Sequence, residues 1–197
     1  MDRLSSRLRA GLLLLFAISI ATWQPANAEE GLRPGESFVT RFSGATDEGG
    51  KPAIDLNGTV GSILDLRHPS TPPQGAQWLN APQRSPVSAG KVGQVFGVAL
   101  DDATPPNIYV TATSAFGLHR SDGNTDWMAG MWGPGGGPGT VWKLDGASGN
   151  KPSIIAEITL DGRANSGAAL GNIAFDRWNK QFFVSDLETG MIHRLRA

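Results

Sequence analysis

Residues 172–186 read NIAFDRWNKQFFVSD and decide the fold. They hold an apolar run that ends in Asp176, a short polar turn, and a second apolar run that ends in Asp186. Short apolar runs bounded by turn residues are typical of buried β-strands. The stretch therefore predicts an antiparallel pair of strands, at residues 169–176 and 181–186.

The same order of segments occurs earlier in the chain. Strand-like runs at 95–100 and 108–113 correspond to 169–176 and 181–186, and residues 139–144 correspond to 190–195. Four short strands in a repeat of roughly 50 residues are typical of a β-propeller blade. The chain is thus predicted to be all-β, with propeller-type blades of four antiparallel strands.

Two registers are possible for the third strand of this repeat. One aligns Leu144 with Leu195, which requires an insertion between Ser114 and Gly139 in the first copy only. The other register aligns His119-Arg120 with His193-Arg194. The first register also aligns the glycine before the strand and the apolar alternation, so we prefer it.

Composition agrees with a chain that turns often. The 197 residues include 26 Gly and 13 Pro, and no segment has a convincing helical period. Formal net charge is −1, so no global field attracts nucleic acid. Cysteine is absent, which excludes disulfides, thiolate metal sites and thiol nucleophiles. The proline-rich stretch 69–86 predicts a loop or an edge strand, because proline removes a ladder donor.

The first 28 residues have the three parts of a secretory signal peptide. Arginines at positions 3, 7 and 9 precede an apolar run at 12–21, and Ala26-Asn27-Ala28 follows. A buried N-terminal helix is the alternative interpretation. We expect a mature chain from Glu29, exported to the periplasm or secreted, with no membrane anchor. Its two regions are 29–93, with N-terminal strands and the proline-rich segment, and 94–197, with the blades and a loop insertion at 114–139.

The 172–186 motif resembles the blades of two propeller families, the NHL-repeat proteins and the SMP-30/gluconolactonase-like proteins. In both, an apolar strand ends in Asp and a second one ends in a small residue and Asp, as at Ser185-Asp186. The resemblance covers roughly residues 94–197 and implies a propeller. It also implies an alternative function, a metal-dependent lactonase-like hydrolase that holds a divalent ion at the propeller axis. The metal motif of that family has Asn before Gly, whereas this chain has Gly171-Asn172.

Length predicts an incomplete ring. Units of about 51 residues give about three blades after residue 28, whereas closed propellers have typically 4–8. The last unit also lacks a fourth strand. We therefore expect an N-terminal fragment of a longer propeller, or copies that self-associate through the open sheet edge.

The insertion at 114–139 is the main candidate for a ligand site. Long loops in compact domains are usually functional or disordered, and apolar residues here argue against disorder. We select His119, Arg120, Trp127 and Trp132 as ligand-binding candidates, for a small-molecule or protein ligand on the loop face. Two interpretations stay open: the tryptophans form a lid or pocket wall, or they plug the end of a sheet.

Three oxygen-bearing side chains in the insertion could hold calcium. Asp122, Asn124 and Asp126 alternate as in oxygen-rich calcium loops. Positions 127 and 133 do not fit an EF-hand, so only a looser site is predicted. A polar turn is the alternative, because Asp, Asn and Gly favour turns.

Other residues are assigned structural roles. Asp101, Asp176 and Asp186 are expected to cap turns, and Trp142 and Trp178 to pack between blades. No hydrolase elbow, P-loop or dinucleotide motif occurs. We therefore predict an exported, soluble binding or scaffold protein of β-propeller type, with no nucleic-acid partner.

Overall fold

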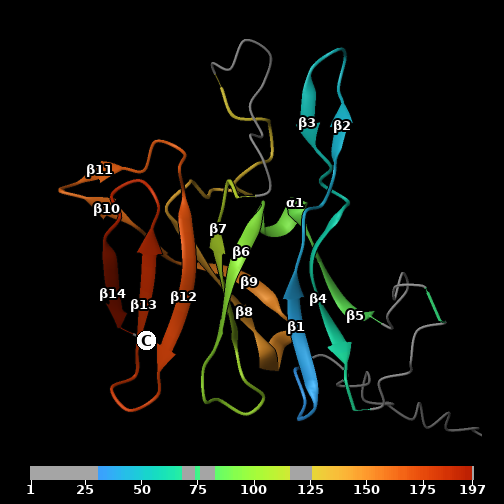
Figure 1. The fold of residues 1–197 in the computed structure, drawn as a ribbon, viewed down its shortest axis with the longest axis vertical. Helices are drawn as coiled ribbons and strands as arrows, with labels where there is room; N and C mark the ends of the chain where they lie inside the picture. Colours follow the sequence, from blue (N-terminus) through green and yellow to red (C-terminus); the bar gives the residue numbers. More distant parts are fainter. Residues whose placement is uncertain (1–30, 68–73, 76–82, 116–125, 197) are drawn as a thin grey trace, which may run out of the picture.

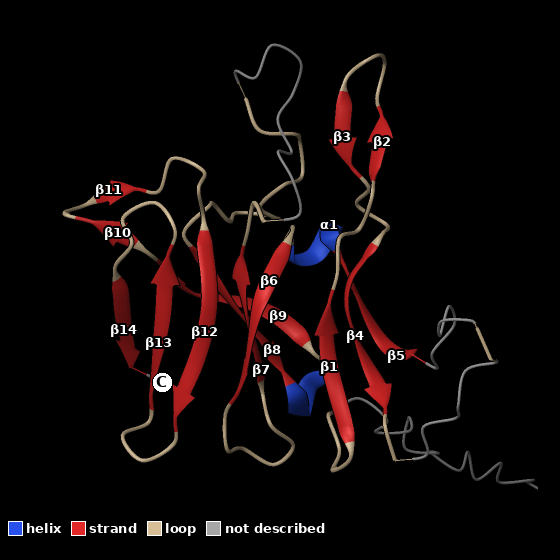
Figure 2. Cartoon of the chain, viewed as in Figure 1, coloured by secondary structure: helices blue, strands red, loops and turns tan. Residues whose placement is uncertain are grey.

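The computed structural model describes residues 31–67, 74–75, 83–115 and 126–196, and its described part is mostly β, with almost no helix (Figures 1 and 2). The elements in chain order are β1 (Glu36–Thr40), β2 (Ala45–Asp47), β3 (Pro52–Ile54), β4 (Thr59–Asp65), β5 (Gln83–Ser88), α1 (Ala89–Val92), β6 (Val95–Leu100), β7 (Ile108–Ala112), β8 (Thr140–Asp145), η2 (Gly146–Ser148), β9 (Lys151–Glu157), β10 (Thr159–Leu160), β11 (Arg163–Ala164), β12 (Leu170–Asp176), β13 (Gln181–Asp186) and β14 (Ile192–Arg196).

Three antiparallel sheets carry the fold. Their strand orders are β1-β4-β5, β6-β7-β8-β9 and β12-β13-β14, and two small hairpins, β2-β3 and β10-β11, extend from them (Figure 1). None of the sheets is closed. The prediction of an all-β chain is confirmed. The predicted signal peptide lies outside the described residues, and within the described ranges no helix is long and apolar enough to cross a bilayer.

The middle and last sheets share one register. Val110 lies opposite Val98, and Val184 lies opposite Ile173. Both strand pairs shift register near the start of their first strand, as expected for a β-bulge. The internal repeat read from the sequence is therefore confirmed for these strands.

The third strand settles the choice between the two registers. Trp142 of β8 lies opposite Val110, and His193 of β14 lies opposite Val184. This pairing aligns Leu144 with Leu195 and not residue 119 with residue 193. The middle sheet has a fourth strand, β9, whereas the last sheet has three strands among the described residues.

A hydroxyl closes the bulge in both copies. Thr111 Oγ1 accepts the backbone N–H of Gly97 at 3.0 Å, and Ser185 Oγ accepts that of Asn172 at 2.9 Å. Thr111 Oγ1 also donates to the carbonyl of Gly171 in the last sheet at 2.7 Å. One side chain thus satisfies the bulge and joins two sheets.

Aspartates cap the first turn of both copies, as predicted. Asp101 accepts hydrogen bonds from the backbone and side chain of Asn107 and from the Tyr109 hydroxyl. Asp176 accepts corresponding bonds from the backbone and side chain of Asn179. These carboxylates hold tight turns between strands.

The first sheet is not a third copy in this register. Thr40 donates to the carbonyl of Phe96, and Ser43 contacts Gln94 at 2.7 Å, so β1 runs antiparallel to β6. An antiparallel bridge between the ends of β7 and β12 makes β6 and β12 parallel to each other. In Figure 1 the arrow of β1 accordingly points up and that of β12 points down. In repeat units related by rotation about one axis, the corresponding strands run in the same direction. β6 and β12 do so, whereas β1 runs in the opposite direction.

Apolar side chains fill the two spaces between the three sheets. The cluster between the first and middle sheets includes Phe38, Ile63, Val110 and Trp142, and the cluster between the middle and last sheets includes Tyr109, Val141, Phe182 and Val184. Trp142 therefore packs between sheets, as predicted. The prediction for Trp178 is wrong: its side chain is 84% exposed, because it lies on the β12–β13 turn beyond the sheet.

The proline-rich segment behaves as expected where the structure describes it. β5 carries Pro86 and forms an edge of its sheet. Ser85 has a positive φ and the β4–β5 pairing shifts register, so this edge is irregular. Residues 68–73 and 76–82 lie outside the described part.

Candidate ligand site at the loop end

The described part of the insertion is attached to both neighbouring sheets. The backbone N–H of Ile54, on the β2-β3 hairpin, donates to the carbonyl of Ala129 at 3.1 Å. The indole N–H of Trp127 donates to the carbonyl of Ser166, which precedes β12, at 3.2 Å. The insertion thus lies across one end of the middle sheet, which we call the loop end.

Apolar side chains hold the insertion there. Met131 is 1% exposed, and the half-buried Trp127 and Trp132 pack edge to face with ring centroids 5.3 Å apart. Gly167, with φ +130°, lies so close to Trp127 that an added Cβ would lie 2.1 Å from the indole nitrogen. Trp127 and Trp132 therefore pack against the end of the core, and a ligand contact by either one stays a prediction.

The remaining insertion candidates cannot be placed. His119, Arg120, Asp122 and Asn124 lie outside the described residues. Asp126 is described, and its side chain is exposed. Among described residues no group of three His, Cys, Asp or Glu could hold a metal ion, so the calcium site stays a prediction.

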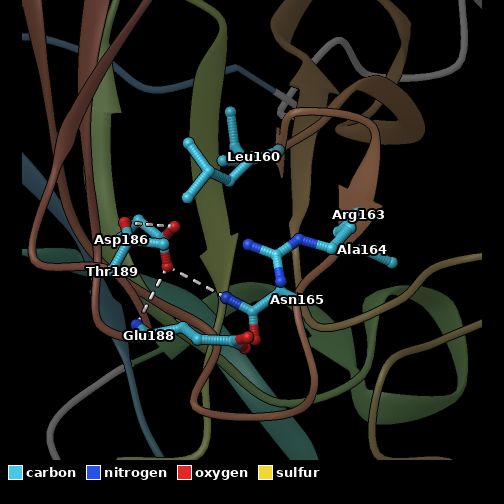
Figure 3. Close-up of a pocket in the computed structure, with 8 residues that line it drawn as sticks. Leu160, Arg163, Ala164, Asn165, Asp186, Glu188 and Thr189 are labelled. Carbon is cyan, nitrogen blue, oxygen red and sulfur yellow. Dashed lines mark hydrogen bonds between the residues drawn. The ribbon is translucent and has the colours of Figure 1, made fainter.

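A pocket of about 220 Å³ opens at the loop end, between the β10-β11 hairpin and the β13–β14 turn (Figure 3). Its lining is mostly polar, with apolar side chains on one wall. The lining residues are Ile158, Leu160, Arg163, Ala164, Asn165, Asp186, Glu188 and Thr189. Ligand pockets usually measure about 300–1,000 Å³, so this one suits a small group rather than a large molecule.

Asp186 forms the floor of the pocket and is fully engaged. Its Oδ1 accepts the Asn165 amide at 3.0 Å and the backbone N–H of Glu188 at 3.0 Å. Its Oδ2 accepts the Thr189 hydroxyl at 2.8 Å and lies 3.4 Å from His193 Nε2. Burial would raise the pKa of Asp186, but these contacts outweigh burial and lower it. The buried carboxylate therefore orders the turn, which confirms the turn-cap prediction.

Neighbouring polar groups are tied down in the same way. Asn165 Oδ1 accepts the backbone N–H groups of Gly167 and Ala169, both at 2.9 Å. Glu188 accepts the backbone N–H of Ser166. The pocket is thus held open by bonds among its own residues, before any ligand binds.

Arg163 is different. Its guanidinium extends into the pocket over Asn165 (Figure 3), and among the described residues it has no ion pair within 4.0 Å. Among the described lining residues it is the only cationic side chain, and no described carboxylate forms an ion pair with it. Sequence analysis missed it, because a single Arg in an Asp-Gly-Arg turn gives no signal of what lies across the pocket.

A larger cavity of about 600 Å³ lies at the opposite end. Its lining is rich in proline and glycine, from the N-terminal segment and two turns: Gly31, Leu32, Arg33, Pro34, Thr104, Pro105, Pro106, Gly146 and Ala147. Gly31, the first residue that the structure describes, is part of its lining. We assign it no ligand.

No family model, curated protein or solved structure matches this chain. Function must therefore be inferred from its own residues. Thr189 supplies the one hydroxyl among the described lining residues, and it donates to Asp186 Oδ2; Asp186 Oδ1 accepts from Asn165 and from the backbone of Glu188. The pocket thus presents the guanidinium of Arg163 and the carboxylate of Glu188 beside ordered polar groups.

Proposed function

We propose that this protein is an exported binding or scaffold protein of β-propeller type that binds an acidic ligand at the loop end. The observation that supports this proposal is the position of Arg163 over a preformed pocket, with no ion pair among the described residues. A guanidinium binds carboxylates through paired hydrogen bonds, which are among the stronger polar contacts in proteins. The ligand is a small carboxylic acid or a carboxylate of a protein partner.

Pocket size and surroundings narrow the ligand. The volume of about 220 Å³ has room for a carboxylate with a few carbon atoms. Leu160 and Ile158 provide an apolar wall, and the carboxylate of Glu188 disfavours a ligand with several negative charges. A short monocarboxylic or sugar acid therefore fits better than a phosphate ester.

Direct binding tests this proposal. Acetate, lactate and glucuronate serve as probes, and the thermal unfolding midpoint and calorimetry report binding. Replacing Arg163→Gln should weaken the best probe by about tenfold or more, since a charge-assisted hydrogen bond contributes about 1.5–3 kcal/mol. Arg196→Gln, an exposed arginine on β14, is the matched control and should bind as wild type does.

Two results would contradict the proposal. One is equal binding by wild type and Arg163→Gln, which would place the ligand elsewhere. The other is no response to any carboxylate at millimolar concentration, which would remove the pocket as a site.

The hydrolase alternative implied by the family resemblance has no support from the described residues. Asn172 is exposed on β12, and its Oδ1 accepts the backbone N–H of Ile173. Lactone hydrolysis in the presence of calcium, manganese or zinc remains its test. Turnover that needs the metal and is lost in Asn172→Ala would establish it.

A further inference from the structure

The pocket at the loop end presents two opposite charges from its two walls. Arg163 comes from the β10-β11 hairpin and Glu188 from the β13–β14 turn. Figure 3 shows the two side chains extending toward Asn165 from opposite sides. Within the described ranges, neither one forms an ion pair within 4.0 Å. Unlike charges that line one small pocket without pairing leave the space between them to a ligand.

The other polar side chains of the lining already have partners. The Asn165 amide donates to the carbonyl of Ala169 at 3.3 Å and to Asp186 Oδ1, and its oxygen accepts two backbone N–H groups. The Thr189 hydroxyl donates to Asp186 Oδ2 and accepts the backbone N–H of Met191 at 3.2 Å. Among the lining residues that the structure describes, the two opposite charges therefore remain to contact a ligand.

Glu188 is held in place by one oxygen and presents the other. Its Oε2 accepts the backbone N–H of Ser166, which lies three residues after Arg163 in the chain. In the described part of the chain no donor reaches its Oε1. A carboxylate oxygen in this position can accept a charge-assisted hydrogen bond from an ammonium group. The bond to Ser166 also fixes Glu188 relative to the segment that carries Arg163.

The charge of the lining disfavours a plain anion. One cation, Arg163, lines the pocket together with two carboxylates, Asp186 and Glu188. A ligand carboxylate on Arg163 brings a third negative charge near Glu188, and like charges at short distance repel. An ammonium group on the same ligand would offset this repulsion, because it would lie against Glu188.

We propose that the ligand of this pocket is a short amino acid bound as a zwitterion. Its carboxylate pairs with the guanidinium of Arg163, its ammonium group donates to Glu188 Oε1, and its carbon chain lies against Leu160. The volume of about 220 Å³ limits that chain to a few carbon atoms. This inference rests on the proposed function, because it takes a carboxylate on Arg163 as its starting point.

Matched pairs of probes test the ammonium contact on the wild-type protein. Acetate and glycine, propionate and β-alanine, and butyrate and 4-aminobutyrate differ within each pair by one amino group. The separation of the two charges increases along the series, so the series finds the spacing that the pocket accepts. By calorimetry we expect the best amino acid to bind about tenfold or more tightly than its matched acid, which corresponds to about 1.4 kcal/mol.

Variants assign the contact to its residue. Glu188→Gln removes the charge and keeps an oxygen for the backbone N–H of Ser166. It should weaken the best amino acid by about tenfold and leave the matched acid unchanged or tighter. Arg163→Gln should weaken both members of the pair. Glu48→Gln, exposed on the β2–β3 turn, is the matched control and should bind as wild type does.

The inference and the proposed function fail in different ways. If no acid and no amino acid binds at millimolar concentration, or if all bind equally to Arg163→Gln, both are overturned. If acids bind through Arg163 but amino acids bind no tighter than their matched acids, the inference alone is overturned. Equal weakening of an acid and its amino acid by Glu188→Gln would also overturn it, because a structural effect of the change would act on both. The comparison of matched probes on the wild type holds even if Glu188→Gln does not fold.

Discussion

Single hydroxyls and carboxylates satisfy the backbone where this chain bends. Thr111 is fully buried and serves two backbone groups on different sheets, Gly97 N–H and the Gly171 carbonyl. Asp101, Asp176 and Asp186 each collect several donors in a turn. Because a buried polar group without a partner costs free energy, such residues contribute more to stability than their size suggests.

The paired hydroxyls permit a matched test. Thr111→Val keeps the shape of the side chain but leaves two buried backbone groups without a partner. We expect it to lower the free energy of unfolding by about 2–4 kcal/mol in urea titration. Ser185→Ala, at the corresponding half-buried position, should cost less than about 1 kcal/mol. Equal effects of the two changes would contradict the inter-sheet role of Thr111.

Stability should fall steeply in acid. Hydrogen bonds from Asn179 and then Gln181 lower the pKa of Asp176 to about 2, and the pKa of Asp186 is also lowered, because its hydrogen bonds outweigh burial. A lowered pKa in the folded state gives stability that is complete above the unfolded value of about 3.9 and is lost as pH falls toward 2. Urea midpoints measured between pH 7 and pH 2 check this expectation.

Asp176→Asn identifies the contribution of this turn. The variant should be less stable than wild type at neutral pH and should lose less stability in acid. A midpoint that is independent of pH in the wild type would contradict the role assigned to these carboxylates.

At the scale of elements, the fold is two related units and one unrelated sheet. β6-β7-β8 and β12-β13-β14 have the same pairings, and the insertion between β7 and β8 occurs only in the first unit. Its described end packs Met131, Trp127 and Trp132 onto the core. The insertion therefore completes the core beside the pocket at the loop end.

Gly167→Ala tests how tightly this segment is seated. The added Cβ would meet the Trp127 indole at 2.1 Å, and the φ of +130° disfavours any side chain. We expect a loss of about 1–3 kcal/mol in unfolding free energy and faster proteolysis within the insertion. Gly162→Ala, also at positive φ but with open space around it, is the control and should cost less. Equal losses would show that backbone strain alone, and not the indole contact, sets the effect.

At the scale of the whole molecule, the three sheets lie side by side without closing (Figure 1). The last sheet ends the row, with Phe183 and Ile192 exposed on its outer face. Export and a propeller ring remain proposals. The two proposals can be tested together, because the mass of the mature protein shows both whether the signal peptide is removed and how many repeat units the chain contains.

Intact mass of the protein isolated from its native host tests the predicted export. Removal of the signal peptide predicts a chain that begins at Glu29, and a mass for residues 29–197 would match it. Retention of residues 1–28 would contradict the predicted cleavage. A much larger mass would show that further units follow.

Strands, turns and the repeat could be predicted from the sequence because their signals are local. Apolar runs bounded by turn residues placed β6, β12 and β13 within a residue or so, and the spacing of Leu144 and Leu195 gave the correct third-strand register. Asp101 and Asp176 were recognised as turn caps, since each ends an apolar run just before a turn and Asp side chains favour turns.

Contacts between distant residues were decided by the tertiary structure alone. The sequence places Trp142 in a strand and Trp178 in a polar turn, but it does not show that a neighbouring sheet covers the first and leaves the second exposed. Nor does it show that β1 opposes β6, or that Arg163 faces Asn165 and Asp186 across a pocket. Burial and charge pairing depend on which surfaces meet, and in this chain those surfaces come from sheets far apart in sequence.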